Sequence, residues 1–339
     1  MSESVKFVGL TRDLLSEAGN ALLPLLSEAD VRALRATCSL ANESVAEYPW
    51  AKHTQIRSRL KSWHQSFPNA KLANVSEYKD LNNQDCKYLA GLKFIDISEN
   101  EHRWPKMAHD RITDEAFVFF KGVKSLRMNG NCYAKITDRA FANLVGIKEL
   151  DMGHCYQYTI TGSAFQYLKG IETLNMCDCN QKSIDDKAIE YISSVSNLNM
   201  HFCNQPTITD KAFSSLKNLR TLDMGYCNQE TITDLAFRNF SKLESLNMTL
   251  CSQRTISDKA FTYLINLKTL NMSQCWQTTI TDNAFISLKK LVKLNISYCR
   301  QLTDFALNCL TNLEELTVSK GQFSEEALGQ LKCNIIVIP

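Results

Sequence analysis

A repeat of 24 residues runs through most of this chain of 339 residues. One leucine recurs at that interval without exception, at Leu126, Leu150, Leu174, Leu198, Leu222, Leu246, Leu270 and Leu294. Eight of the 13 cysteines keep the same register after a first interval of 23, at Cys132, Cys155, Cys179, Cys203, Cys227, Cys251, Cys275 and Cys299. A constant long interval marks the same place in a repeated structural unit. The chain is therefore restricted to folds that stack similar units.

Each repeated unit contains one strand-like half and one helix-like half. In the unit LRTLDMGYCNQETITDLAFRNFSK, at 219–242, apolar and polar residues alternate around Leu222, which is typical of a strand. The second half opens with Thr233 and Asp234, whose side chains can cap exposed helix amides, and continues with apolar residues at helical spacing. Because one unit cannot bury both halves, neighbouring units must stack and share a core.

The pattern LxxLxMxxC followed by ITDxAFxxL is that of a leucine-rich repeat. We therefore expect an α/β fold, a leucine-rich-repeat solenoid: a horseshoe with parallel strands on the concave face and helices outside, preceded by a small α-helical head. Ten units begin at Leu92, the first lengthened by an insertion at 99–110, and a degenerate eleventh is expected within 67–91. The predicted divisions are the helical head (1–60), a connecting segment with the degenerate first repeat (61–91) and the solenoid (92–339).

Three columns of similar residues follow the period. Stacked cysteines would lie about 4.8 Å apart, within disulfide reach, but we interpret them as small buried hydrophobic residues with a weak S–H donor. The glutamines two residues after each cysteine, Gln157, Gln181, Gln205, Gln229, Gln253, Gln277 and Gln301, should bond to one another or to the turn backbone. The third column should form a polar concave stripe of Asp96, Asp151, Asn175, Asn199, Asp223, Asn247, Asn271 and Asn295.

Composition restricts the compartment and the partners. Lys and Arg number 38 and Asp and Glu 36, and a net charge of +2 favours neither nucleic acid nor an anionic membrane. No apolar run approaches the roughly 18 residues of a membrane span, and the N-terminus lacks a signal-peptide pattern. Unpaired thiols and six glycosylation sequons fit a reducing compartment. We predict a cytoplasmic or nuclear protein with no nucleic-acid or membrane partner.

No catalytic motif is found in the sequence. GxGxxG, GxxxxGK[ST], HExxH and GxSxG are all missing, so we expect no enzyme, no cofactor and no catalytic residue. His102 and His109 share the 99–110 insertion with acidic residues, so a metal site there is one interpretation. The favoured interpretation is a solvated loop that folds over one edge of the horseshoe. His154 and His201 have no paired nucleophile and are interpreted as binding-surface residues.

The repeats resemble the cysteine-containing class of leucine-rich repeat. The resemblance rests on a cysteine after LxLxx and a following ITD, covers about 92–332, and is closest in LVKLNISYCRQLTDFALNCLTN at 291–312. The other units carry two extra residues between the cysteine and the isoleucine, which should lengthen the turn and keep the architecture. In that class such arrays commonly follow an F-box.

Residues 14–50 resemble an F-box. LLPLLSEADVRALRATC, at 22–38, matches that family's pattern, and Tyr48-Pro49-Trp50 resembles its aromatic end. The sequence departs from the family at Leu15, where a proline is usual, and at Ala18 and Gly19, where large aliphatic residues are usual. The resemblance implies contacts with a Skp-type adaptor at Leu14, Glu17, Leu22, Leu23, Leu26 and Asp30.

The resemblance implies a non-enzymatic interaction module, a substrate receptor of a cullin-type ubiquitin ligase. The departures from the F-box leave a second interpretation open: a helical cap without adaptor binding, on a structural or scaffold protein. The TITDxAF wording is also similar to leucine-rich-repeat proteins of large DNA viruses of protists. That source would make the scaffold a viral particle component, in the host cytoplasm or the virion. We expect a monomer or a subunit of a hetero-complex.

The concave face is the predicted site for a protein partner. Two residues after each strand methionine, or its equivalent, stand His154, Asp178, Phe202, Tyr226, Leu250, Gln274, Tyr298 and Lys320. Core packing does not require aromatic side chains there, and Tyr and Trp are favoured anchors of protein interfaces. The alternative is that these rings only pack along the concave rim. The predicted protein-binding residues are His154, Asp178, Phe202, Tyr226, Trp276, Tyr298, Asp223, Asn247 and Asn271.

Overall fold

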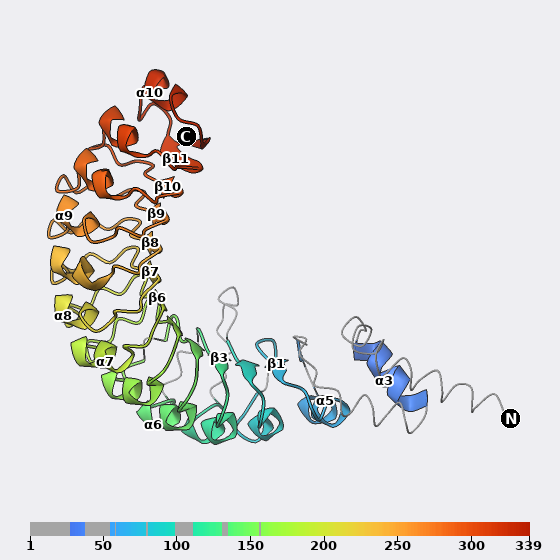
Figure 1. Cartoon of the computed structure of the whole chain (residues 1–339). Helices are drawn as coiled ribbons and strands as arrows, with labels where there is room; N and C mark the ends of the chain where they lie inside the picture. The colour runs from blue at the N-terminus through green and yellow to red at the C-terminus, as the bar shows by residue number, and fades with distance from the viewer. Residues whose placement is uncertain are drawn as a thin grey trace.

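The computed structural model describes residues 28–37, 55–57, 59–78, 81–98, 111–130, 135–155 and 157–339. The described residues form a curved solenoid in which the strands line the inner side of the arc and the helices the outer side (Figure 1). The strands form one parallel sheet of twelve, ordered as in the sequence from β1 to β12. This is the predicted leucine-rich-repeat solenoid. Within the described residues, no helix has the length and apolar character to cross a membrane.

The strands are short and evenly repeated. They are β1 (Leu72–Asn74), β2 (Phe94–Asp96), β3 (Ser125–Arg127), β4 (Glu149–Asp151), β5 (Thr173–Asn175), β6 (Asn197–Asn199), β7 (Thr221–Asp223), β8 (Ser245–Asn247), β9 (Thr269–Asn271), β10 (Lys293–Asn295), β11 (Glu315–Ser319) and β12 (Asn334–Ile338). The repeated leucine sits at the centre of its strand, and Leu222 lies in register with Leu198 on β6 and Leu246 on β8. The constant interval of 24 therefore keeps every central leucine in register inside the core.

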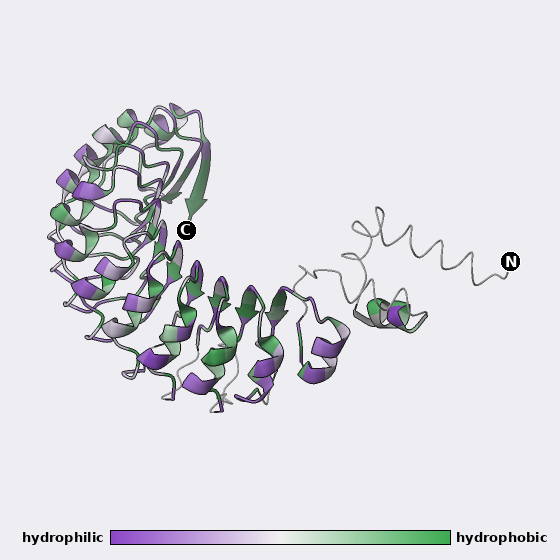
Figure 2. Ribbon diagram, turned by 60° about the horizontal axis from the view of Figure 1, so that its bottom comes forward, coloured by the Kyte–Doolittle hydropathy of each residue, from purple (hydrophilic) through white to green (hydrophobic). Residues whose placement is uncertain are grey.

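The helical halves are shorter than the sequence pattern suggests, and many are 3₁₀ helices. A repeat of 24 residues leaves only a few positions for the helix, and 3₁₀ geometry is common in such short segments. Hydrophobic and hydrophilic residues lie side by side on them (Figure 2). The α-helices are α3 (Glu28–Thr37), α5 (Leu60–Ser66), α6 (Asp138–Phe141), α7 (Asp186–Tyr191), α8 (Asp210–Phe213), α9 (Asp258–Phe261) and α10 (Glu325–Gly329). The 3₁₀ helices are η2 (Asp85–Leu89), η3 (Asp114–Phe120), η4 (Ala142–Leu144), η5 (Gly162–Leu168), η6 (Asp234–Asn239), η7 (Asp282–Ser287) and η8 (Asp304–Cys309).

The Thr-Asp pair that opens each helix links neighbouring repeats. Thr209 caps α8, as predicted, because its hydroxyl oxygen accepts from the Lys211 N–H at 3.2 Å. The same threonine donates its own N–H and hydroxyl to the two carboxylate oxygens of Asp186 in the preceding repeat, at 2.7 and 2.8 Å. Equivalent pairs are Asp114–Thr137, Asp138–Thr161, Asp210–Thr233, Asp234–Ser257, Asp258–Thr281 and Asp282–Thr303. This second use of the motif was not predicted.

At one boundary between repeats, the hydrogen-bonded Asp–Thr pair is replaced by glycine and aspartate. Gly162 stands where the other repeats have aspartate, and Asp185 stands where they have threonine or serine. The Gly162 N–H donates to the Ser183 carbonyl at 3.1 Å, and Asp185 caps α7 through the Ala188 N–H. A Cβ at Gly162 would overlap the Ser183 carbonyl oxygen. Glycine at position 162 avoids a second carboxylate facing Asp185, and the close Ser183 carbonyl leaves no room there for a Cβ.

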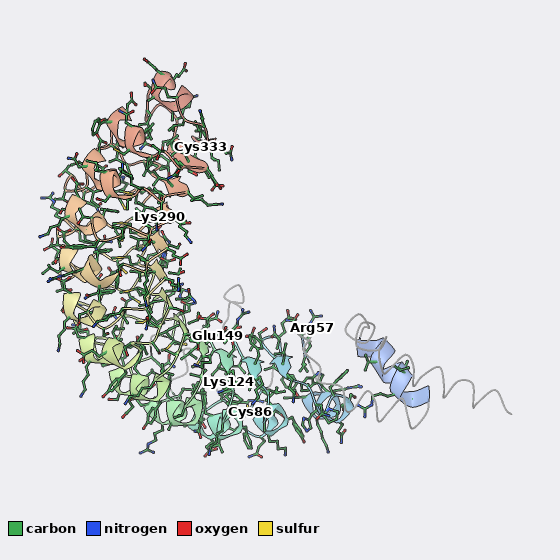
Figure 3. All side chains as sticks on the ribbon, in the orientation of Figure 1. Arg57, Cys86, Lys124, Glu149, Lys290 and Cys333 are labelled. Atoms are coloured by element: carbon green, nitrogen blue, oxygen red, sulfur yellow. The ribbon has the colours of Figure 1, made fainter. Side chains whose placement is uncertain are left out.

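The cysteine column is buried, as predicted, and its members from Cys179 to Cys299 are free thiols. Each thiol donates to the carbonyl of the methionine 27 residues before it, as from Cys227 to Met200 at 3.1 Å and from Cys275 to Met248 at 2.9 Å. Burial raises the pKa of the Cys299 thiol to about 12. Outside this column, Cys86 is buried and Cys333 half-buried, at opposite ends of the solenoid (Figure 3). Cys132 lies outside the described residues.

The glutamine column is buried, except for the half-buried Gln301, and is only partly hydrogen-bonded. Gln181, Gln205 and Gln301 each donate from Nε2 to the cysteine carbonyl of the preceding repeat, at 2.6, 3.0 and 2.9 Å, which fits the predicted bond to turn backbone. Gln181 Nε2 also donates to the backbone carbonyl of Gln157 at 3.3 Å, but no side-chain amides of the column bond to each other among the described residues. Both amide atoms lack a hydrogen-bond partner there in Gln157, Gln229, Gln253 and Gln277.

The N-terminal region meets the first repeats through α3 and α5. Leu60 and Trp63 of α5 and Val31 of α3 are buried, and all three belong to the continuous core. The predicted adaptor-binding residues Leu14, Glu17, Leu22, Leu23 and Leu26 lie outside the described residues. Asp30 lies within α3. The F-box-like head and its boundary at residue 60 stay predictions.

Candidate protein-binding surface

The predicted concave column has an unusual backbone conformation. Phe202 and Tyr226 have φ of 58°, in the left-handed region, and each donates its N–H to a carbonyl of the next repeat, of Gly225 at 2.9 Å and of Thr249 at 2.8 Å. Gly130, which stands in the same column, is also left-handed. We define the left-handed column as the seven other residues that share this conformation, with φ from 56° to 61°: His154, Asp178, Phe202, Tyr226, Leu250, Gln274 and Tyr298.

Most residues of the left-handed column are poorly suited to their backbone. The left-handed region costs an L-residue roughly 1–2 kcal/mol, and glycine, asparagine or aspartate are the usual occupants. Leu250 and the three aromatic members accept that cost in a turn whose hydrogen bonds glycine could also make. Lys320, the predicted next member, does not share the conformation, because Gly321 takes the left-handed position at φ 73°.

His201, Phe202 and Tyr226 form an aromatic cluster on the concave side. The rings of Phe202 and Tyr226 stack with centroids 4.1 Å apart and planes at 29°. The His201 ring lies edge-on to both, at 4.7 Å from Phe202 and 5.1 Å from Tyr226. Phe202 remains 40% exposed. An exposed, pre-assembled ring pair is typical of an interaction surface rather than of core packing.

Carboxylates adjoin this aromatic cluster. His201 Nδ1 lies 3.1 Å from Asp223 Oδ1, and His154 Nδ1 lies 3.3 Å from Asp178 Oδ2. Asp151, one repeat before Asp178, is half-buried, and burial raises its pKa although a hydrogen bond from the Gly153 N–H lowers it. Acidic groups therefore line the column next to the rings.

The polar stripe on the strands serves the turn that follows it. The side-chain oxygens of Asp223, Asn247 and Asn271 accept from the N–H two residues ahead, of Gly225, Thr249 and Ser273 at 3.0, 3.1 and 3.2 Å. Each such bond closes a local turn just before the left-handed residue. These side-chain oxygens, which were predicted to contact a partner, therefore already accept hydrogen bonds within their own repeats.

An asparagine ladder, which was not predicted, lies beside the left-handed column. Asn180, Asn204 and Asn228 follow their cysteines directly, and each side-chain oxygen accepts from the backbone N–H of the equivalent residue one repeat later. The distances are 2.7, 2.6 and 2.7 Å, and Ser252 ends the series. The signal was available, because asparagine recurs at the 24-residue interval.

The structure does not gather all the predicted aromatic anchors. Trp276 is 56% exposed, and no ring contact joins it to Tyr226 among the described residues. Tyr298 donates its hydroxyl to the Pro339 carbonyl at 2.6 Å, and so contacts the end of the chain. The central anchors are therefore Phe202 and Tyr226, with His201 as their third ring. Among the described residues, no group of three or more His, Cys, Asp or Glu is placed to hold a metal ion.

Comparisons with known proteins agree with this architecture. A search of curated proteins finds no significant match. The crystal structure of the Rad7 and Elc1 complex in yeast contains a similar chain, with a TM-score of 0.57, 17% identity, and coverage of 99% of this chain and 93% of that one. The TLR13-ssRNA13 complex gives a TM-score of 0.55 and 21% identity over 82% of this chain, which spans 38% of that chain. At these identities the likeness concerns the fold alone.

The family is identified by the repeats themselves. The model of the BspA type leucine rich repeat region matches residues 94–220 and 206–335, in six copies. These ranges cover most of the chain and extend from β2 to the start of β12. The chain belongs to the BspA-type leucine-rich-repeat family.

Proposed function

We propose that this protein is a non-enzymatic interaction module that holds a protein partner on its concave face. The observation that carries the proposal is the left-handed column, in which bulky side chains occupy a conformation that glycine or asparagine adopts at lower cost. Strained conformations of this kind cluster at functional sites. The column spans seven repeats, roughly 30 Å at the usual strand spacing, which suits a macromolecular partner.

Photocrosslinking tests the concave face directly. A photoreactive benzoylphenylalanine replaces either Leu250, in the left-handed column, or Leu235, which lies on the outer helix η6 and is 52% exposed. In extract of the source cells, the concave position should capture a defined protein and the outer position should not. The captured protein, once purified, should bind the Phe202→Ala/Tyr226→Ala variant at least tenfold more weakly than wild type. Capture from the outer position alone would refute the proposal.

We further propose that the head recruits a Skp-type adaptor, so that the protein acts as a substrate receptor of a cullin-type ubiquitin ligase. The F-box-like pattern around Leu22 and Leu26 supports this. The fold likeness to a chain of the Rad7 and Elc1 complex in yeast extends over 99% of this chain and adds support. In this role the protein supplies proximity, by placing a bound target near separate catalytic machinery.

A pull-down with Skp-type adaptor and cullin tests the head. Full-length protein should capture both, and the Leu22→Ala/Leu26→Ala variant should capture neither while its circular dichroism matches wild type. If folded full-length protein ignores the adaptor, the receptor role fails. The protein would then be a scaffold whose head covers the first repeat.

A further inference from the structure

The charged side chains around the aromatic cluster are mainly acidic. From β4 to β9, two sets of positions face the concave side: the strand residues on either side of the central leucine, and the left-handed residue of each turn with the residue before it. These positions carry four carboxylates, of Glu149, Asp151, Asp178 and Asp223, and no Lys or Arg. Arg127 of β3 lies in register with Asp151 at one end of this stretch. Glu149 lies on the inner side of the arc (Figure 3). The whole chain has a net charge of +2, so this acidity is local.

Three cations that stand just before these strands already have acidic partners. Lys148, Arg220 and Lys268 stand just before their strands, and all three pair with glutamates of the same row. Lys148 binds Glu172 at 2.7 Å, and Lys268 binds Glu244 at 2.7 Å. They are therefore not free to neutralise the carboxylates beside the rings.

We infer that the aromatic cluster and the carboxylates of Asp178 and Asp223 bind a basic side chain of the protein partner. The inference rests on the proposed protein-binding function and specifies the chemistry of the partner at this site. Aromatic faces attract a cation through the ring quadrupole, and a planar guanidinium also stacks on them. A carboxylate at the ring edge adds a charge-assisted hydrogen bond. Phosphate groups and acidic segments are disfavoured by the same four carboxylates.

The stacked pair is pre-assembled for this contact. Phe202 and Tyr226 already stack at 4.1 Å in the free protein, and His201, bonded to Asp223, packs edge-on against them. Binding therefore does not have to order these rings, which reduces the entropic cost of association. The exposed ring of Phe202 provides the accessible part of the site.

Peptide binding to the full-length protein tests the inference. The probe is a fluorescein-labelled nonapeptide of alternating glycine and arginine, and its control carries citrulline, which has the shape of arginine without the charge. Fluorescence anisotropy at about 150 mM salt limits long-range attraction. The arginine peptide should bind about tenfold more tightly than the citrulline peptide. Equal binding of the two peptides would overturn the inference.

Matched variants locate the binding. Asp178→Asn/Asp223→Asn removes two charges without loss of the turns, because asparagine occupies the equivalent strand position in Asn199 and Asn247 and tolerates the left-handed region. This variant should weaken binding of the arginine peptide about fivefold. Phe202→Leu, which keeps an apolar side chain but removes the ring, should weaken it about threefold. Glu230→Gln/Glu314→Gln makes the same charge change at exposed positions elsewhere and should leave binding unchanged.

Wild-type affinity in the Asp178→Asn/Asp223→Asn variant would overturn the inference, as would equal weakening by the control pair. The proposed function is tested separately, because photocrosslinking from position 250 does not depend on arginine. A partner captured there without preference for the arginine peptide would leave the protein-binding function standing and remove only the basic side chain.

Discussion

The carboxylate of Asp210 accepts two hydrogen bonds from Thr233 of the next repeat, from its N–H at 2.7 Å and its hydroxyl at 2.7 Å. The same hydroxyl oxygen caps η6 through the Leu235 N–H. Two side chains therefore satisfy a helix start and fasten it to its neighbour. Because a solenoid has only nearest-neighbour contacts, its stability depends on such boundaries.

Asp210→Ala should lower the free energy of unfolding by about 2 kcal/mol, since it removes both charge-assisted bonds and leaves the Thr233 donors without that acceptor. Urea denaturation followed by circular dichroism measures the change. Glu230→Ala, at an exposed position of the following turn, is the control and should shift the midpoint little. Equal stability of the two variants would show that the hydrogen bonds between Asp210 and Thr233 do not stabilise the boundary between the two repeats.

Gly162→Ala should destabilise the protein by about 1–3 kcal/mol, because the added methyl group overlaps the Ser183 carbonyl and forces the two repeats apart. Gly329→Ala is the matched control, because a Cβ there meets no atom within 4 Å. Thermal unfolding of the two variants should separate them clearly. A Gly162→Ala protein as stable as wild type would mean that this boundary relaxes easily.

Gln229→Met should stabilise the protein by about 1 kcal/mol, because it replaces a buried amide without partners among the described residues by an apolar side chain of similar length. The same change at Gln205, whose Nε2 donates to the Cys179 carbonyl at 3.0 Å, should be unfavourable. The denaturant midpoints of the two variants, each compared with wild type, measure these opposite changes in stability. Loss of stability at both positions would show that the Gln229 amide is hydrogen-bonded in solution.

Leu250→Asn should raise stability by about 0.5–1 kcal/mol, because asparagine tolerates the left-handed backbone at φ 57° better than leucine does. Leu235→Asn makes the same change at an exposed position on the outer helix η6, where the backbone is not left-handed, and should bring no gain. Differential scanning calorimetry of both variants is the measurement. A gain at neither position would mean that the left-handed turn carries little strain.

Alkaline pH should weaken the fold through the buried thiols. Burial raises the pKa of Cys299 to about 12 from an ordinary 9.0, so the unfolded chain loses this proton first. The stability from the protonated thiol is complete below pH 9.0 and is lost as the pH rises toward about 12. The free energy of unfolding of wild type and of Cys299→Ser is measured at pH 8 and at about pH 10.5. The decrease between these two pH values should be about 2 kcal/mol smaller in the variant than in wild type. Equal losses would contradict the assignment.

Much of the architecture followed from the repeat. The interval between successive leucines such as Leu198 and Leu222 predicts parallel strands in register, and the structure confirms it. The buried thiol donors were also predicted correctly, because a column at constant spacing must occupy one environment. The 3₁₀ form of half of the described helices was not predicted, since a short apolar pattern does not distinguish an α-helical turn from a 3₁₀ turn. The adaptor-binding residues from Leu14 to Leu26 stay untested predictions.

The candidate site divides in the same way. Phe202 and Tyr226 were predicted as concave residues from their place in the repeat, which depends only on the sequence period. Their left-handed backbone, their stacking at 4.1 Å and the link from His201 to Asp223 depend on contacts between residues about one repeat apart. By itself the sequence determined which residues share a column, because periodicity is a property of the chain. Only the tertiary structure decided which columns bond across repeats and which rings meet, because those contacts depend on side-chain geometry between stacked units.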